Sequence, residues 1–455
     1  MAVLDTVKDD VLVSVRGLKT YYSVRGSFGQ RLVGREAGHV KAVDDVSFDL
    51  YRGEVLGLVG ESGSGKTTLG RTLLGLVPAT EGSVTFEGEE ITHKSERDLR
   101  AIRRRMQIVF QDPHASLNPA MTIEQSVGHP LTIHRIARGR EYRQRVAEAL
   151  ETVGLAPPDQ FLEKYPSDLS GGQKQRAVIA RAIILNPLLL VADEPVSMLD
   201  MSVRAKILEL MLNLKHEFGF TYLYITHDLA TAKFFCDRIA ILYLGRIVEI
   251  GPSAAIYEDP KHPYTKALLR AIPEPDPLRS VPRDLPRGEI PDAAHPPLGC
   301  SFHPRCPAAF EVCGWEGRDL RDVLELRWTH MAEEEYEAER STIGDMGSLD
   351  TPSTSFRVAA GDGRGGSDVL ALLETVRNEA RDEPFWKGVR NLTAADGHVE
   401  VELFDPLVPR LLPLGSAQVE CHLYDHEALS EALRRRAEGR AEMATGGQSP
   451  PVESS

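Results

Sequence analysis

The 455-residue sequence has few of the features that mark secreted, membrane-spanning or nucleic-acid-binding proteins. Its five cysteines are too sparse for a disulfide scaffold, which indicates a reducing compartment. No apolar run approaches the roughly 20 residues that a membrane span needs, and the start, MAVLDTVKDD, does not resemble a secretion signal. The net charge of −14 predicts no broad basic surface, so nucleic acid is not an expected partner. These deficits predict a soluble or peripheral protein that would reach a membrane only through a partner.

The residue pattern predicts an α/β protein with more than one domain. Hydrophobic residues make up 42% and charged residues 26%, a balance that allows at least one large core. Short apolar runs over 11–60 indicate strands, whereas most of 84–181 has the spacing of amphipathic helices. From Pro187, strand-like PLLLVAD and TYLYIT alternate with helical SVRAKILELMLNLKHEFG and DLATAKFFC, as parallel βα units do. This order indicates a helical insert in an α/β domain, followed by a separate C-terminal module.

The first chemical motif is GESGSGKT, which follows the strand-like EVLGLV and opens a helix at Lys66. Small residues let the backbone wrap around a phosphate with several N–H groups pointing at it, and the helix dipole adds positive potential. Lys66 would reach the outer phosphates and Thr67 would ligate Mg²⁺; a plain Gly/Ser-rich turn is the alternative. The nucleotide-binding residues predicted here are Gly60, Ser62, Gly63, Ser64, Gly65, Lys66, Thr67 and Thr68.

A second motif is an apolar run that ends in two carboxylates, Asp193 and Glu194. A buried strand would carry both to the edge of the sheet. Asp193 then fits a Mg²⁺ partner, and Glu194 fits a general base that polarises the attacking water. An ordinary strand end is the alternative, but the position downstream of a phosphate loop favours the catalytic interpretation.

The segment LSGGQKQR closely resembles the signature of ABC ATPases, and it lies just upstream of the Asp-Glu strand. At a helix N-terminus it would present a hydroxyl and backbone N–H groups to a γ-phosphate, which in that family belongs to nucleotide held by the opposite subunit. A simple helix cap is the alternative. The residues assigned to this contact are Ser170, Gly171, Gly172 and Gln173.

Other positions match ABC ATPases in the family order, so the resemblance covers roughly residues 11–330. It implies that Gln111 is the Q-loop residue, catalytic and a Mg²⁺ ligand, that Asp200 ends the D-loop and that His227 is the switch histidine. It also implies that Tyr22, or failing that Tyr21, stacks on adenine. The fold implied is a P-loop nucleotide-binding domain with a helical subdomain.

Further segments resemble the ATPases of peptide and nickel importers, namely QDPHASLNP, HPYTKALL and PLGCSFHPRCP. The resemblance implies a peripheral subunit on the cytoplasmic face of the membrane that hydrolyses ATP to drive uptake of di- or oligopeptides. Its partners would be a related ATPase in a heterodimer, two permease subunits that meet residues 111–125, and indirectly an extracytoplasmic solute-binding protein. Import of nickel or another small solute is the alternative. A soluble ABC ATPase without transport is disfavoured, because the chain has one cassette and no long coiled-coil insertion.

Three of the five cysteines fall in one Pro- and Gly-containing stretch, with a spacing that fits structural zinc sites poorly. Members of the resembled family can hold a [4Fe–4S] cluster with four thiolates. Thr329 stands where the fourth cysteine is expected, but VECHL supplies Cys421 after an insertion. Zinc, metal-free thiols and a redox enzyme are the alternatives, the last without any flavin or nicotinamide fingerprint. Cys236 is expected in the core, and the proposed cluster ligands are Cys300, Cys306, Cys313 and Cys421.

These patterns divide the chain into four expected parts. The nucleotide-binding domain is expected over 11–255, with its helical subdomain over 112–178, and the cysteine-containing extension over 256–335. An insertion with a low-complexity linker is expected over 336–415, with a helix in SDVLALLETVRNEARDEPFW and a strand in HVEVELFD. The last part, 416–455, would end in a disordered tail from Met443.

Overall fold

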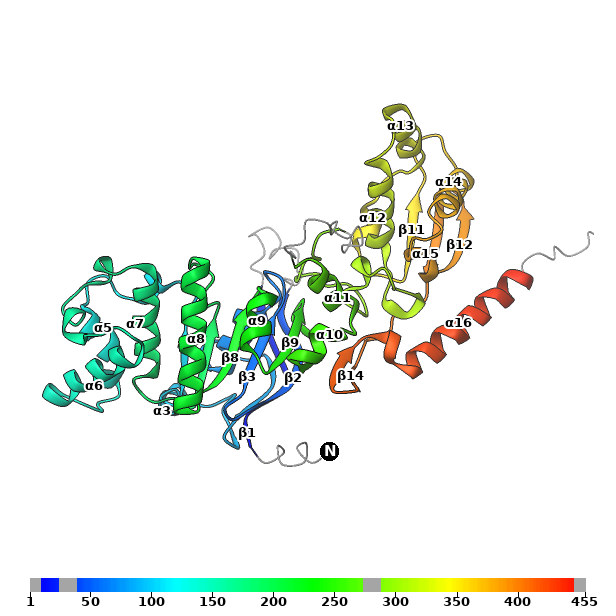
Figure 1. Cartoon of the computed structure of the whole chain (residues 1–455). Helices are drawn as coiled ribbons and strands as arrows, with labels where there is room; N and C mark the ends of the chain where they lie inside the picture. The colour runs from blue at the N-terminus through cyan, green and yellow to red at the C-terminus, as the bar shows by residue number, and fades with distance from the viewer. Residues whose placement is uncertain (1–9, 24–38, 273–287, 446–455) are drawn as a thin grey trace, which may run out of the picture. The chain divides into compact units, whose positions relative to one another are not determined.

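The computed structural model describes residues 10–23, 39–272 and 288–445 (Figure 1). It contains two compact units, Met1–Asp259 and Pro260–Ser455, and each is described by itself. Within the described ranges, no helix combines the length and the apolar character needed to cross a membrane.

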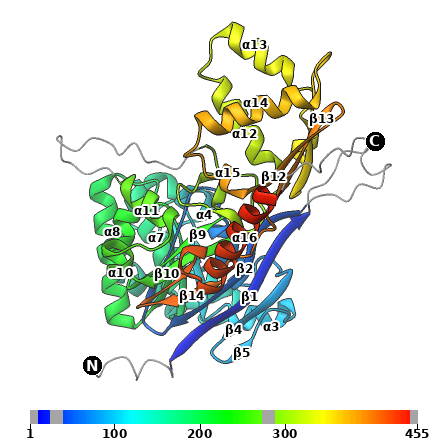
Figure 2. The same cartoon turned by 90° about the vertical axis from the view of Figure 1, so that its right-hand side faces the viewer.

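The first unit is built on two layers of strands. An antiparallel sheet has the order β2-β1-β4-β5 (Figure 2). The second layer has the order β10-β9-β3-β8-β7-β6, in which the pairs β9-β3, β3-β8, β8-β7 and β7-β6 are parallel. Strands β3, β7 and β8 are buried along their whole length, as their nearly continuous apolar sequences require. The bounds are β1 Val11–Ser23, β2 His39–Tyr51, β3 Val55–Val59, β4 Glu81–Phe86, β5 Glu89–Glu90, β6 Met106–Val109, β7 Leu189–Asp193, β8 Thr221–Thr226, β9 Arg238–Tyr243 and β10 Arg246–Pro252.

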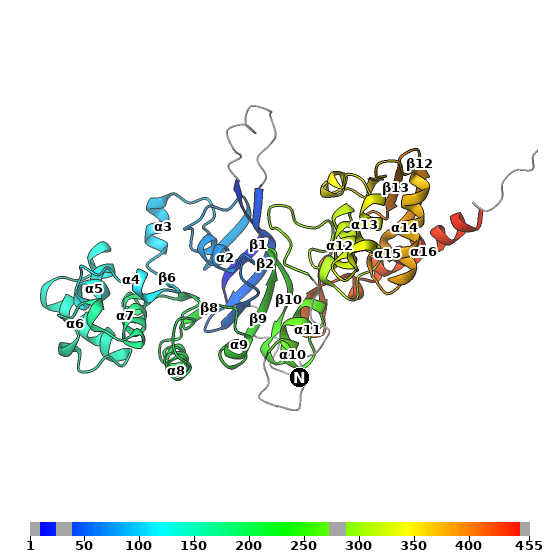
Figure 3. The same cartoon turned by 90° about the horizontal axis from the view of Figure 1, so that it is seen from above.

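Helices α5, α6 and α7 of the first unit pack against one another as a helical subdomain (Figure 3). The expectation of helices over most of 84–181 was wrong at its start and at MQIV, which form strands β4 and β6. A four-residue segment carries too little periodicity to choose between helix and strand, and here pairing with β7 decides. The bounds are α2 Lys66–Leu73, α3 Glu96–Ile102, α4 Pro113–Ser116, α5 Ile123–Ile133, α6 Gly139–Thr152, η1 Pro158–Gln160, η2 Pro166–Asp168, α7 Gly171–Ile183, α8 Met201–Phe218, α9 Leu229–Phe235 and α10 Ser253–Glu258.

The second unit contains a three-stranded antiparallel sheet of order β11-β13-β12, with α14 packed against it (Figure 1). Val399, Val401 and Leu403 of β13 alternate into a core that also holds Trp315, and Phe385 lies beside that indole. The bounds are α11 Pro263–Arg270, η3 His303–Arg305, η4 Glu311–Cys313, α12 Gly317–Trp328, α13 Glu333–Thr342, η5 Gly347–Asp350, β11 Ser355–Ala359, α14 Gly366–Glu379, α15 Phe385–Gly388, β12 Val389–Ala395, β13 His398–Leu403, β14 Leu411–Leu414, β15 Ala417–Glu420, η6 His422–Tyr424 and α16 His426–Thr445.

The second unit differs from the expectation in two places. Part of the segment expected to be a low-complexity linker forms β11, because Phe356 and Val358 pair with β13 and bury their side chains. The expected disordered tail begins inside α16, which continues to Thr445, and 446–455 lie outside the described residues. The expected domain boundaries at 335 and 415 remain predictions. One hydrophobic core contains residues from both sides of each boundary.

Candidate nucleotide site and cysteine cavity

The loop from Gly60 to Thr67 joins the end of β3 to the start of α2. Gly65 is the N-cap residue of α2, with a φ of 99° that L side chains rarely adopt. A Cβ atom at Gly65 would lie 1.9 Å from the carbonyl oxygen of Ala42, so another residue would clash with the backbone. The glycine therefore fixes the tight turn that presents the start of α2.

Lys66 folds back over this loop. Its Nζ donates to the carbonyl oxygens of Gly60 and Glu61, both at 2.8 Å, and lies 3.4 Å from Ser64 Oγ. The side chain is buried, and burial lowers the pKa of Lys66, whereas the carboxylates of Glu194, Asp193 and Glu61 oppose that shift. A positive charge is thus held at the centre of the loop.

The hydroxyl of Thr67 donates to Asp193 Oδ1 at 2.9 Å. Asp193 is the last residue of β7 and is buried, and burial raises the pKa of its carboxyl, although the Thr67 hydrogen bond acts in the opposite direction. The next loop residue, Thr68, lies in the first turn of α2 and accepts from the Thr72 hydroxyl through its carbonyl oxygen. A hydroxyl and a carboxylate therefore meet beside the phosphate loop.

Glu194 is held from three sides. Its backbone N–H donates to the carbonyl oxygen of Ile225 at 2.9 Å. Its Oε2 accepts from Gln111 Nε2 at 2.9 Å, and its Oε1 lies 3.1 Å from His227 Nδ1. The three side chains follow the neighbouring parallel strands β6, β7 and β8, whose carboxyl ends meet at one edge of the sheet. The structure thus brings together three residues that lie far apart in the sequence.

The signature segment forms the start of α7. Ser170 is the N-cap residue, and its hydroxyl accepts from Gln173 N–H at 3.3 Å, while Gln173 Oε1 accepts from Ser170 N–H at 3.0 Å. Ser170 is exposed, and Gly171 and Gly172 are half-buried in the first turn. The same residues thus cap the helix and lie at its surface.

The remaining predicted nucleotide contacts lie at the surface. Asp200 is the exposed N-cap residue of α8. Tyr22 near the end of β1 is 43% exposed, whereas the Tyr21 hydroxyl donates to Asp44, and burial raises the Tyr21 pKa. The ring of Tyr22 is therefore better placed than that of Tyr21 to stack on a ligand.

Sequence reasoning missed two contacts that hold these motifs. Arg204 donates from Nε to the carbonyl oxygen of Leu199 at 2.7 Å and from Nη2 to that of Ser197 at 3.0 Å, which fixes the D-loop. His114 Nδ1 lies 3.2 Å from Lys174 Nζ, which joins α4 to the signature helix. These residues lie within or beside the sequence motifs, but only the folded structure shows which of them contact one another.

The four predicted cluster cysteines line one cavity of about 20 Å³ in the second unit. Burial raises the pKa of Cys300 and of Cys306 to about 12 and that of Cys313 well above its ordinary value. Phe310 N–H donates to Cys313 Sγ at 3.4 Å. None of the chain's five cysteines, all of which are described, forms a disulfide. The cavity therefore collects four thiols, of which Cys313 and Cys421 are buried and Cys300 and Cys306 are half-buried.

Histidines border the same cavity. His303 contacts the carbonyl oxygen of Cys300 at 2.8 Å and Asp319 Oδ2 at 3.1 Å, and His262 and His422 also line the wall. Among the described residues, no three His, Cys, Asp or Glu side chains converge closely enough to hold a single metal ion. This arrangement gives no support to a mononuclear zinc site.

The phosphate loop, the Asp-Glu strand end and a helical subdomain that opens a helix with LSGGQ define an ATPase of the ABC class. The ABC transporter family model matches residues 43–197. The model of the oligopeptide/dipeptide transporter C-terminal region matches residues 248–313, which include three of the four cavity cysteines.

The chain is 48% identical to a peptide import ATP-binding protein of Brucella ovis over 312 residues, which is 69% of this chain and 94% of the relative. It is 45% identical to the oligopeptide transport ATP-binding protein AppF of Bacillus subtilis over 313 residues, or 68% and 93% of the two chains. A solved dimer of the bacterial ABC cassette MJ0796 is 31% identical over 53% of this chain and 98% of its own, with a TM-score of 0.47. The chain belongs to the family of ATP-hydrolysing subunits of oligopeptide/dipeptide ABC importers. Nearly a third of it has no counterpart in these relatives.

Proposed function

We propose that this chain hydrolyses ATP at the cytoplasmic face of the membrane to drive uptake of di- or oligopeptides through a permease. The observation that carries the chemistry is the position of Glu194, which Gln111 and His227 hold on both carboxylate oxygens. The names of the relatives, which describe peptide import, support the choice of solute.

Glu194 acts as the general base in this proposal. Hydrolysis requires a carboxylate whose orientation is fixed before the water attacks. His227 and Gln111 supply that orientation, and Lys66 binds the outer phosphates from the loop. Residues of the segment Gly60–Thr68 donate backbone N–H groups to the phosphates, and Tyr22 stacks on adenine.

The oxygens near Thr67 fit a magnesium ion. Mg²⁺ prefers oxygen ligands, and Thr67 Oγ1 already lies 2.9 Å from Asp193 Oδ1. Thr67, Asp193 and the amide oxygen of Gln111 would hold the ion. When bound, Mg²⁺ neutralises part of the charge of the phosphates.

The signature residues complete a site on another chain in this proposal. Ser170 and Asp200 are exposed and the first turn of α7 is half-buried, so these residues are accessible to nucleotide on a related ATPase. The segment 111–125 meets the permease, and the contact of His114 with Lys174 links that segment to the signature helix. A movement of segment 111–125 at the permease would therefore be transmitted to the signature helix at the nucleotide interface.

The cysteine cavity is proposed to hold a structural [4Fe–4S] cluster. Cys300, Cys306, Cys313 and Cys421 supply four thiols to one cavity without converging as for a single ion, and a backbone N–H points at Cys313 Sγ. The donor set thus fits a cluster bound by four thiolates. Such a cluster would crosslink η4 to the segment after β15 and would not change oxidation state during transport.

Reconstitution with the permease, the related ATPase and the solute-binding protein tests the proposed function. Peptide uptake into proteoliposomes should require ATP and should disappear when this chain carries Glu194→Gln. Transport of Ni²⁺ but not of peptides would show that the chain belongs to a nickel importer, the alternative considered above. ATP hydrolysis indifferent to the permease and to the binding protein would contradict the transporter role.

A further inference from the structure

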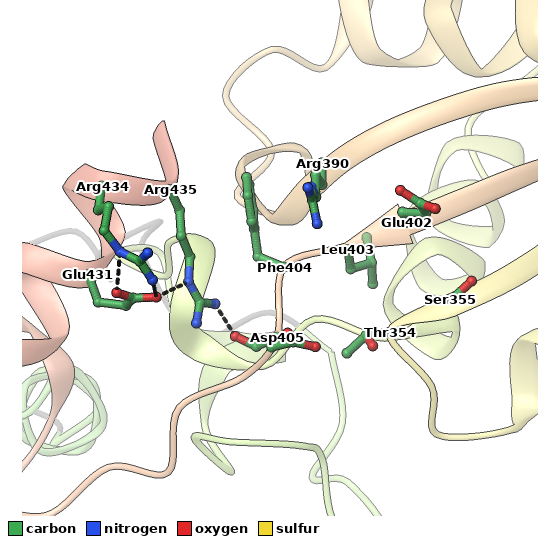
Figure 4. A pocket seen from close by; sticks show the side chains of 10 residues that line it. All are labelled: Thr354, Ser355, Arg390, Glu402, Leu403, Phe404, Asp405, Glu431, Arg434 and Arg435. Carbon is green, nitrogen blue, oxygen red and sulfur yellow. Dashed lines mark hydrogen bonds and ion pairs between the residues drawn. The ribbon is translucent and has the colours of Figure 1, made fainter. Parts of the chain in front are cut away.

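The second unit contains a cavity of about 320 Å³ between the first turns of α16 and one end of the sheet β11-β13-β12 (Figure 4). Its lining comes largely from beyond the part that the oligopeptide/dipeptide C-terminal model matches, which ends at Cys313. None of the roles assigned to the nucleotide site or to the cysteines uses these residues. The lining residues that carry charge are Arg390, Glu402, Asp405, Glu431, Arg434 and Arg435.

The wall formed by α16 carries a net positive charge. Arg434 and Arg435 both bond to Glu431, with Arg434 Nη2 to Glu431 Oε1 at 2.8 Å and Arg435 Nε to the same oxygen at 2.7 Å. Arg434 Nε also donates to Glu431 Oε2 at 2.9 Å. The hydrogen bonds from the two arginines lower the pKa of Glu431 to about 2, so its charge persists at neutral pH. Two guanidinium groups and one carboxylate leave an excess of one positive charge on this wall.

The opposite wall carries a net negative charge. It is formed by the start of β11, the start of β12, and the end of β13 with the residues that follow it. Its charged residues are Glu402, Asp405 and Arg390. Figure 4 shows Glu402, Ser355 and Thr354 on the side of the cavity away from Glu431, with Phe404 between the two groups. Two carboxylates and one guanidinium leave an excess of one negative charge here, beside two hydroxyl groups that both donate and accept.

The guanidinium of Arg435 retains capacity for a ligand. Arg435 uses Nε for Glu431 and Nη1 for the carbonyl oxygen of Asp405, whereas a guanidinium carries five N–H donors. Glu431 also fixes the direction of both arginine side chains, so less rotamer freedom is lost when an anion binds. Planar N–H donors of this kind match a carboxylate in geometry.

We propose that this cavity binds a short peptide with free ends, with its carboxylate on the α16 wall and its ammonium group on the sheet wall. The opposite excess charges of the two walls match a zwitterion and do not match a simple anion or cation. The choice of a peptide among zwitterions rests on the proposed function, because the chain would then meet the imported solute at its own cytoplasmic surface. The site would make the ATPase responsive to accumulated product.

An adjoining cavity of about 490 Å³ favours a peptide over a single amino acid. It shares Glu431 and Arg434 with the first cavity and adds the apolar side chains of Leu407, Val408 and Ala428. A second residue of the ligand, with an apolar side chain, has space there. We expect alanyl-leucine to bind more tightly than free alanine.

Calorimetric titration of the purified full-length chain tests this assignment. The probes are alanyl-leucine, its C-terminal amide, its N-acetyl form, free alanine and inorganic phosphate. The unmodified dipeptide should bind at least about tenfold more tightly than either blocked form, because each loses one charged hydrogen bond. Phosphate binding as tight as that of the dipeptide, or absence of dipeptide binding, would overturn the proposal.

Paired variants assign the two walls. Arg435→Gln should weaken binding of the dipeptide at least about tenfold but leave binding of its amide unaffected. Glu402→Gln should weaken binding of the dipeptide by a similar factor but leave binding of its N-acetyl form unaffected. Arg357→Gln and Glu400→Gln are the controls, since both lie on the same sheet and outside the cavity. Equal losses in the controls would contradict the assignment. ATP hydrolysis with the permease is measured on the same preparation. Normal hydrolysis without dipeptide binding would contradict this site alone, whereas hydrolysis indifferent to the permease would contradict the proposed function.

Discussion

Among the individual residues, Glu194 combines an unusual backbone conformation with a proposed catalytic role. Its φ of 46° places a non-glycine residue in the left-handed region, which only a few per cent of such residues occupy. The hydrogen bond from its N–H to Ile225 and the contacts with Gln111 and His227 hold this conformation. Strained backbone at a carboxylate held by two side chains is typical of a catalytic position.

Glu194→Gln should therefore slow ATP hydrolysis about 10²- to 10⁴-fold, because the amide cannot accept the proton of the attacking water. Nucleotide affinity should stay close to that of the unmodified chain, since Lys66 and the loop are unchanged. Phosphate release and equilibrium ATP binding measure the two effects separately. Glu209→Gln, an exposed carboxylate on α8, is the matched control. A Glu194→Gln protein that keeps half of its hydrolysis rate would exclude the general-base role.

Cys421→Ser should lower the iron content and the visible absorbance of anaerobically purified protein, because one of four thiolate ligands is lost. Cys236→Ser is the control, since Cys236 is buried in the first unit and does not line the cysteine cavity. Iron analysis and absorbance spectra of the two variants give the comparison. Equal iron in Cys421→Ser and in the unmodified chain would remove Cys421 from the ligand set.

At the scale of elements, strand order explains why the proposed catalytic residues meet. Strands β6, β7 and β8 are parallel neighbours, so the residues that follow them lie at one edge of the sheet. In the second unit, by contrast, antiparallel pairing of β11, β12 and β13 leaves one sheet face for α14 to cover. The packing of α14 is therefore the contact on which this sheet depends most.

Leu373→Ala on α14 should lower the free energy of unfolding of the second unit by about 2–5 kcal/mol, because Leu373 is 0% exposed within its core. All three tryptophans, Trp315, Trp328 and Trp386, lie in that unit, so urea titration followed by tryptophan fluorescence reports on it. Leu370→Ala, one turn earlier and only partly buried, should lower the free energy of unfolding clearly less. Equal midpoints for the two variants would show that α14 does not support the sheet.

At the scale of the whole molecule, the chain carries two half-sites that serve different nucleotides in the proposed assembly. In that proposal Lys66 would bind nucleotide on this chain, whereas Ser170 would contact nucleotide held by the related ATPase. Each half-site would then need its complement from another polypeptide. The catalytic unit is therefore expected to be a pair of chains.

In the complex with the related ATPase, Lys66→Ala and Ser170→Arg should each spare one of the two composite sites, whereas the double variant should abolish hydrolysis. ATPase rates of the three complexes provide the measurement. The two single variants mixed without the related ATPase should stay inactive, because a chain that forms only heterodimers does not pair with another copy of itself. Activity restored by that mixture would show a homodimer instead.

The sequence alone determined the family, the nucleotide motifs and most strands and helices of the first unit. Those features depend on chemistry within a few residues, such as glycines in a phosphate loop or an apolar run that ends in Asp193. Short segments were less predictable: MQIV and the segment that includes Phe356 became strands only through pairing with β7 and β13. Hydrogen bonds to a distant strand outweigh local preference in runs this short.

Tertiary structure alone decided which distant side chains share a site. Gln111, Glu194 and His227 meet because parallel strands end at one edge, and Cys421 reaches Cys313 because the intervening segment folds into the same core. The cavity between α16 and the sheet has no sequence motif, since its charges come from two strands, a loop and a helix. Sequence spacing fixes contacts along a strand or a helix turn, but contacts between elements follow from how their apolar faces are buried together.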